Sequence, residues 1–174
     1  MMPQMKVIQK FIDICLFKAG PEAIPANNRL LGWVLLIYFA VSVLINQIDM
    51  SFRISLWSSF SELIVLAAFL YVLLKVNGYL LRYQQSLTAL AATGSLLGLL
   101  ALPFLSAFHQ YAEQAATNNF LLLALMLLML WSLMVTAHIF RRTLDTSAGK
   151  AVALTIFYVL VAIIINGLVR SGVA

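Results

Sequence analysis

The chain has 174 residues, of which 63% are hydrophobic and only 10% are charged, and its mean hydropathy is +1.00. A water-soluble domain is about a quarter charged, so this composition excludes a soluble globular protein and indicates a membrane protein. In that class, the net charge of +5 informs on orientation in the bilayer and does not predict nucleic-acid binding. The single cysteine, Cys15, excludes an intramolecular disulfide and a thiolate metal cluster.

The stretch 5–18 has a helical period but is too short to span a bilayer. Its polar side chains recur at helical spacing on one face: Lys6, Gln9, Lys10 and Asp13. Two interpretations carry equal weight, a basic amphipathic helix on the membrane surface or a cytoplasmic helix packed against the bundle ends. Pro21 and Pro25 then interrupt the helix. We expect residues 1–29 to form a cytoplasmic amphipathic segment with a proline-bearing hinge.

Five apolar runs of spanning length follow, which makes residues 30–174 a predicted transmembrane domain. A helix rises about 1.5 Å per residue, so about 20 apolar residues cross the hydrocarbon core. The runs are 30–48, 55–76, 86–108, 120–140 and 151–170. The run 120–140 is the clearest, because it contains no Asp, Glu, Lys or Arg. The predicted fold class is all-α, a polytopic bundle of five transmembrane helices preceded by a short amphipathic helix.

Two of these runs carry features that suggest helix packing. Tyr38, Ser42 and Asn46 recur at every fourth residue of the first run, and such a polar stripe favours contact with other helices. Gly94 and Gly98 form a small-xxx-small step in the third run, where small residues let two helix backbones approach closely. We predict that this step is a close-packing surface. Pro103 should kink the last turns of that helix or end it early.

Basic residues gather on one side of the predicted spans. Nine of them lie in the N-terminal segment and in two connections: Lys6, Lys10, Lys18, Arg29, Lys75, Arg82, Arg141, Arg142 and Lys150. Only Arg53 and Arg170 fall on the other side. The positive-inside rule therefore predicts a cytoplasmic N-terminus and an external C-terminus, with the cluster Arg141, Arg142 and Lys150 as topology determinants. We expect a bacterial inner (cytoplasmic) membrane location.

The sequence carries no pattern for catalysis, metal binding or a cofactor. His109 and His138 fall near opposite membrane faces and cannot share a metal. The sequence also lacks HExxH, GxSxG and a phosphate-binding glycine-rich loop. We therefore predict that the protein is not an enzyme and uses no cofactor. A loose set of polar residues remains on the outer half: Asn46, Asp49, Glu62, His109, Glu113 and Asn166.

Glu62 stands out in this set, because an ionisable group inside the bilayer needs a partner or a water-filled path. One hypothesis is a proton- or ion-linked site built from Glu62 with Asn46 and Asn166. The simpler interpretation is a carboxylate near the interface, hydrogen-bonded to neighbouring Ser or Asn side chains or paired with Arg53 or Arg170. The predicted position of Glu62 near a helix end favours this simpler interpretation.

Three stretches resemble the Yip-domain family of small multi-pass membrane proteins, especially its bacterial branch. They are LFKAGPEAIPANNRLL (16–31), RYQQSLTALAATGSLLGLLALP (82–103) and HIFRRTLDTSAGKAVAL (138–154). The layout of five spans after a proline-bearing approach is also similar. The resemblance implies a five-helix membrane protein and transfers no catalytic residue. Eukaryotic members share acidic–aromatic motifs that are absent here, so their Rab-binding role is not carried over.

The sequence thus predicts a multi-pass inner-membrane protein with a structural, assembly or membrane-organising function, acting by helix–helix and partner binding. The expected partners are the lipid bilayer and other membrane proteins or the chain itself, with no nucleic acid. The alternative is a small transporter or channel-type subunit that uses the outer polar cluster around Glu62. The two differ in one observable, because the alternative needs Glu62, Asn46 and Asn166 to converge on a cavity.

Overall fold

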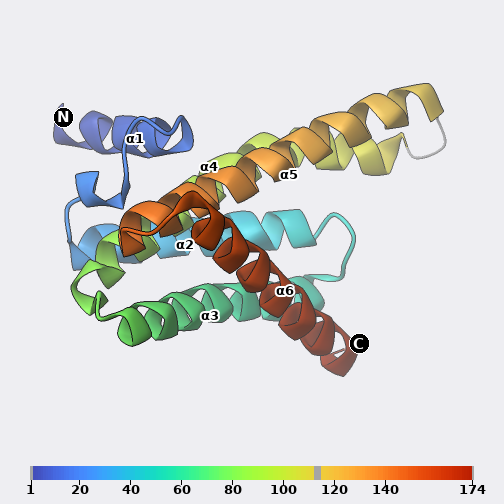
Figure 1. The fold of residues 1–174 in the computed structure, drawn as a ribbon. Coiled ribbons are helices and arrows are strands. Elements are labelled where there is room, and N and C mark those ends of the chain that lie inside the picture. The colour runs from blue at the N-terminus through green and yellow to red at the C-terminus, as the bar shows by residue number, and fades with distance from the viewer. Residues whose placement is uncertain (1, 112–114, 174) are drawn as a thin grey trace.

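The structure is a computed structural model that describes residues 2–111 and 115–173, and these residues form helices and turns without a strand. The helices are α1 (Met2–Cys15), α2 (Asn28–Asn46), α3 (Phe52–Asn77), α4 (Tyr83–Gln110), α5 (Ala115–Leu144) and α6 (Ala148–Val173), with short 3₁₀ turns η1 (Pro21–Ala23) and η2 (Leu80–Arg82) (Figure 1). Helices α2 to α6 are long and apolar enough to cross a membrane. The predicted all-α fold is confirmed.

The helix ends differ from the hydropathy runs, because backbone capping rather than side-chain polarity sets where a helix begins and ends. The Asn27 side chain accepts a hydrogen bond from the Arg29 N–H, so α2 begins two residues before the predicted run. Gly78 ends α3 with φ of 78°, a left-handed conformation that glycine adopts without strain. Of the two alternatives for Pro103, a kink or an early end of α4, the early end is wrong, since the helix continues to Gln110. A proline inside a membrane helix is tolerated where neighbouring groups satisfy the backbone.

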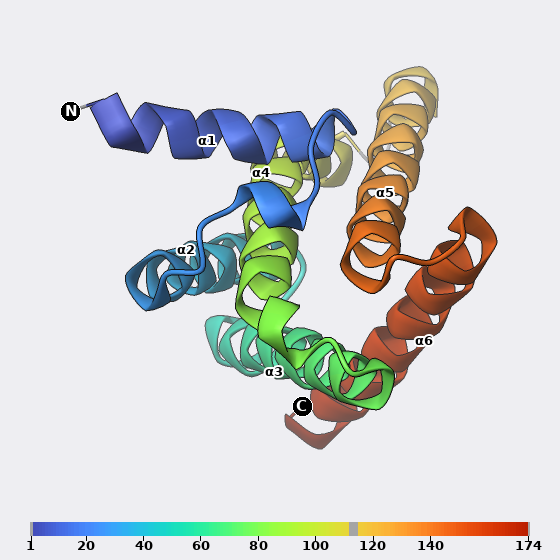
Figure 2. The same ribbon diagram turned by 60° about the vertical axis from the view of Figure 1, so that its left-hand side comes forward.

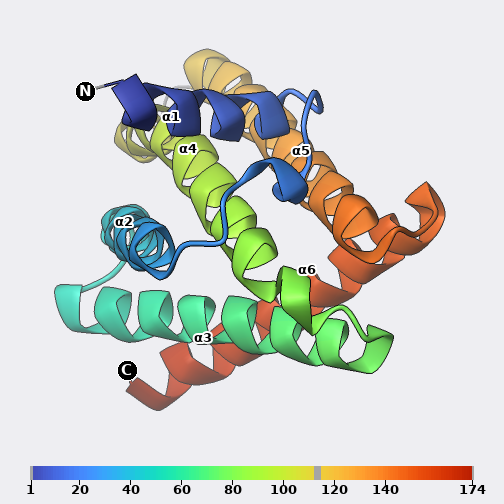
Figure 3. The ribbon, with the colours of Figure 1, turned by 90° about the vertical axis from the view of Figure 1, so that its left-hand side faces the viewer.

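The helices gather at one end and spread apart at the other. Helix α4 packs against α2 and α5, while α3 packs against α2 and α6. Helix α1, the turns η1 and η2 and the α5–α6 turn all lie at the gathered end (Figures 1 and 3). From there the α4–α5 hairpin, the α2–α3 pair and α6 diverge (Figure 1). We call these the gathered end and the splayed end.

Polar contacts hold the gathered end together. The Arg82 guanidinium donates to the Thr143 carbonyl at 2.9 Å and pairs with the Asp145 carboxylate at 2.6 Å. Arg142 lies 3.9 Å from the Glu22 carboxylate in a half-exposed ion pair. These contacts bring η1, the α3–α4 connection and the α5–α6 turn to the same end. The predicted topology determinants lie in the helix ends beside this turn, Arg141 and Arg142 in the last turn of α5 and Lys150 in the first turn of α6.

Helix α1 combines features of both sequence interpretations. It lies across α4 and beside α5 (Figure 2), with Phe11 and Ile14 buried against the bundle. The Trp131 indole N–H donates to the Cys15 carbonyl at 3.1 Å, which ties the end of α1 to α5. Its other side exposes a second apolar stripe at every fourth residue: Ile8, Ile12 and Leu16. One face of α1 is therefore packed on the bundle, and an exposed apolar face remains for a lipid surface.

We expect the Cys15 thiol to resist alkylation in the folded protein. Burial raises the pKa of this thiol from its ordinary value of 9.0 to about 11, and the thiolate is the reactive form. N-ethylmaleimide at pH 8 should label the folded protein at least tenfold more slowly than the denatured chain. Because folding raises this pKa, the unfolded chain releases the thiol proton at a lower pH than the folded protein. Burial of the neutral thiol therefore contributes fully to folding stability below about pH 9, and this contribution is lost as the pH rises through about 11. Equal labelling rates in both states would show that α1 does not bury Cys15.

Candidate intramembrane polar site

Helix α3 presents a continuous polar stripe toward its neighbours in the splayed half. Ser55, Ser58, Ser59 and Glu62 fall at i, i+3, i+4 and i+7, and the three serines are fully buried. Sequence reasoning missed the serines, although their helical spacing from Glu62 was a usable signal. A helix facing lipid on this side would not carry such a stripe, so the serines mark where α3 meets α2 and α6.

Glu62 lies deeper in its helix than the sequence analysis expected. Helix α3 begins at Phe52, three residues before the predicted run. At about 1.5 Å per residue, Glu62 lies about 15 Å along the helix, close to half the thickness of a hydrocarbon core. Glu62 therefore lies almost three turns from the start of α3, about one turn deeper than the predicted run implies.

Two side chains of α2 hold the Glu62 carboxylate. The Ser42 hydroxyl donates to Oε2, and the Asn46 amide donates to Oε1 at 3.4 Å and to the Ser59 hydroxyl at 3.1 Å. Ser42 and Asn46 are both buried. Because Ser42 and Asn46 are four residues apart, one face of α2 reaches both carboxylate oxygens.

Arg170 of α6 joins this network through Asn46. Its guanidinium donates to the Asn46 side-chain oxygen at 3.1 Å and to the Ser58 hydroxyl at 3.2 Å. No ion pair within 4.0 Å connects Glu62 to a cation in the part of the chain that the structure describes. Arg53, the other cation weighed as a partner, is exposed. Asn46 therefore lies between the two charges and accepts from one while donating to the other.

Asn166 approaches the network without bonding to Glu62. Its amide donates to the Ala162 carbonyl one turn back at 3.1 Å. Its side-chain oxygen is buried and has no hydrogen-bond partner among the described residues. Asn166 lines a cavity of about 450 Å³ together with Glu62, Arg170, Tyr38 and Tyr158 of α2, α3 and α6, which we call the α6 cavity. The three predicted residues do not share one cavity, because Glu62 and Asn166 line the α6 cavity and Asn46 does not.

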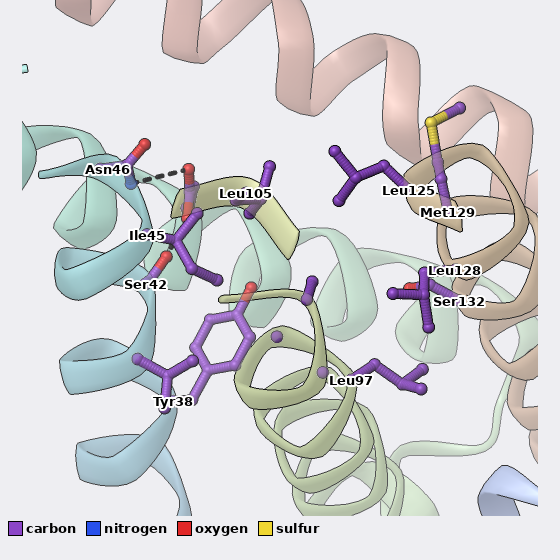
Figure 4. Close-up of a pocket in the computed structure, with 15 residues that line it drawn as sticks. Tyr38, Ser42, Ile45, Asn46, Leu97, Leu105, Leu125, Leu128, Met129 and Ser132 are labelled. Atoms are coloured by element: carbon purple, nitrogen blue, oxygen red, sulfur yellow. Dashed lines mark hydrogen bonds between the residues drawn. The ribbon is translucent and has the colours of Figure 1, made fainter. Parts of the chain in front are cut away.

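A second cavity lies on the other side of Glu62. It has a volume of about 460 Å³, and we call it the α5 cavity because α5 forms its far wall. One wall is polar and carries Tyr38, Ser42, Asn46 and Glu62. The opposite wall carries Leu125, Leu128 and Met129 of α5, and Leu125 extends toward the α2 side chains across the space (Figure 4). Tyr38 and Glu62 line both cavities.

Gly94 and Gly98 lie where α4 meets α2. A Cβ placed on Gly98 would lie 3.0 Å from Val41 Cγ1 and 3.1 Å from Ile45 Cδ1, and one on Gly94 would lie 3.0 Å from the Tyr38 ring. Both glycines also line the α5 cavity. The small-xxx-small step therefore brings α2 close to α4 inside the chain and sets the position of Tyr38.

The other residues of the predicted polar set do not join the site. Asp49 and His109 face each other at 3.6 Å on the exposed surface of the splayed end. Glu113 lies outside the described residues. Within residues 2–111 and 115–173 no three His, Cys, Asp or Glu side chains are grouped to hold a metal ion. The site around Glu62 thus consists of one carboxylate, one guanidinium, amides and hydroxyls.

Comparisons with models of protein families, with curated proteins and with solved structures find no match to this chain.

Proposed function

We propose that this protein is a small transporter or channel-type subunit that admits a small cation or proton to the polar site around Glu62. One observation carries this proposal: the Glu62 carboxylate lines two open cavities, one of about 460 Å³ and one of about 450 Å³. Small-molecule sites in proteins have volumes of this order. Five apolar helices provide the membrane domain that such a site requires.

The contacts of Glu62 support the proposal further. Ser42 and Asn46 hold both carboxylate oxygens, while the nearest guanidinium binds Asn46 instead of Glu62. These hydrogen bonds are the ones that the simpler interpretation predicted, but without a direct ion pair the carboxylate keeps a negative charge that can attract a cation. The arrangement keeps Glu62 oriented by hydrogen bonds, and the carboxylate lines both cavities.

The proposal is tested by flux across a bilayer. Purified protein is reconstituted into liposomes that contain a pH-sensitive dye, and a potassium gradient with valinomycin imposes an inside-negative potential. We expect proton entry above that of protein-free liposomes. Proteoliposomes no leakier than empty ones for protons, sodium and potassium would rule the proposal out.

The inner-membrane location and the orientation are proposed together. The basic residues of the α3–α4 connection and the α5–α6 turn lie at the gathered end, and the positive-inside rule puts that end in the cytoplasm. A fusion of alkaline phosphatase to the C-terminus should be active in a bacterial host, and a fusion of green fluorescent protein there should be dark. The reverse pattern would invert the proposed orientation.

The structural or assembly function expected from the sequence is the second candidate. Its predicted close-packing surface, Gly94 and Gly98, packs on α2 within the same chain. An assembly partner would therefore use the exposed apolar faces of α5 and α6, which lipid can also cover. Co-purification from native membranes tests for a protein partner. The Yip-domain resemblance stays a prediction and fits either function.

A further inference from the structure

We infer that the α5 cavity binds a lipophilic organic cation, a molecule with a positively charged centre and an apolar body. This inference adds a second ligand class to the site around Glu62, beside the small cation or proton, and thus rests on the proposed function. The two walls of this cavity differ in chemistry, and the positive charge of Arg170 lies only on the side of the α6 cavity.

The polar wall is suited to a positive charge. Glu62 is its only charged residue, and Tyr38 adds an aromatic ring beside the carboxylate. A carboxylate and an aromatic ring together favour an organic cation, since the ring face attracts positive charge and the carboxylate supplies the counter-charge. The hydroxyl of Ser42 and the amide of Asn46 orient the carboxylate.

The far wall is suited to hydrocarbon rather than to a hydrated metal ion. Its residues come from α4 and α5 and are almost all apolar: Leu97, Ala101, Leu105, Leu125, Leu128 and Met129. Ser132 is the one polar side chain that α5 adds to this lining, so a hydrated inorganic cation would find few ligands to replace its water there. An apolar body gains free energy by filling such a wall, and the flexible Met129 side chain can adapt to its shape.

Arg170 makes the α6 cavity less favourable for a cation than the α5 cavity. The guanidinium lines the α6 cavity and is absent from the lining of the α5 cavity. A cation in the α5 cavity therefore meets Glu62 with Asn46 between it and the positive charge. In the α6 cavity the same ligand would face Arg170 directly. The charge distribution thus assigns the lipophilic cation to the α5 cavity.

Tetraphenylphosphonium is the probe for this inference. Its binding to the purified full-length protein in detergent is measured by titration calorimetry, together with that of tetraphenylborate, an anion of the same shape, and tetramethylammonium, a cation with little apolar surface. We expect saturable binding of tetraphenylphosphonium and at least tenfold weaker binding of the other two. Comparable affinity for tetraphenylborate, or for tetramethylammonium, would overturn the inference.

Variants locate the binding. Glu62→Gln should weaken tetraphenylphosphonium binding at least tenfold, and Leu128→Trp should do so by filling the apolar wall. The matched controls are Glu22→Gln, a carboxylate at the gathered end, and Leu127→Trp on an exposed part of α5, and both should bind like the wild type. Wild-type affinity in Glu62→Gln or in Leu128→Trp would overturn the inference, and Leu128→Trp decides the outcome if Glu62→Gln does not fold.

The calorimetric test of ligand binding and the flux test of transport can fail independently of each other. Calorimetry in detergent needs no transport, so a protein that binds tetraphenylphosphonium but conducts no ion contradicts only the proposed transport. Proton flux without tetraphenylphosphonium binding contradicts only the ligand class.

Discussion

Glu62→Gln is expected to lower the proton flux of proteoliposomes at least tenfold while the protein still assembles in the membrane. Glutamine has nearly the same shape but cannot carry a negative charge or exchange a proton at neutral pH. Its side-chain oxygen can accept from the Asn46 amide and its NH₂ group can donate to the Ser42 hydroxyl, so both contacts can persist without the charge. Because these hydrogen bonds lose their charge assistance, we expect a loss of stability of about 1 kcal/mol, roughly the difference between hydrogen bonds to charged and to neutral groups.

The matched control for this variant is Glu22→Gln. Glu22 is a carboxylate at the gathered end that pairs with Arg142 in an exposed position. Its replacement removes the same charge without touching the cavities, so flux should stay at the wild-type value. Membrane protein level and elution on gel filtration are measured for both variants. A Glu62→Gln protein with undiminished flux would show that Glu62 has only a structural role.

Gly98→Leu is expected to destabilise the protein by separating α2 from α4. A Cβ at this position already lies 3.0 Å from Val41 and 3.1 Å from Ile45, closer than nearly all real contacts. An added leucine would force these side chains or the α2 backbone to move, and overpacking of this kind costs about 1 to 3 kcal/mol. The melting temperature in detergent should fall by several degrees, and Gly98→Ala should show a smaller drop.

Gly32→Leu is the matched control for the packing prediction. Gly32 also lies within a spanning helix, but a Cβ there meets no atom within 4 Å. The same substitution should leave the melting temperature nearly unchanged or raise it slightly, because glycine is a poor helix former. If Gly98→Leu melts like Gly32→Leu, the close approach of α2 and α4 is absent in the membrane protein.

Much of the site was within reach of the sequence. The stripe Tyr38, Ser42 and Asn46 has the spacing of one helix face, and Glu62 was recognised as an ionisable group in an apolar run. The buried serines of α3 could have been found by extending that spacing back from Glu62. The network through Arg170 could not, because α6 meets α2 and α3 only through packing between distant segments.

The Gly94–Gly98 step also separates what the sequence predicts from what only the structure shows. The spacing predicted close packing, and the structure supplies the partner, which is α2 of the same chain. Sequence patterns identify a surface that can pack closely, but any small-residue step is compatible with many partners. Which helix occupies it depends on the lengths of the connections and on the crossing of the helices.

The sequence by itself determined the fold class, the number of long apolar helices and the polar or apolar character of each face. These follow from local properties, since about 20 apolar residues and a helical period can be recognised without knowing any neighbour. Only the tertiary structure decided that the polar faces of α2, α3 and α6 meet and that Asn46 lies between Glu62 and Arg170. It also decided that cavities lie on both sides of the carboxylate. The physical reason is that these features depend on the separation of helices at the splayed end, which side-chain packing between distant segments sets.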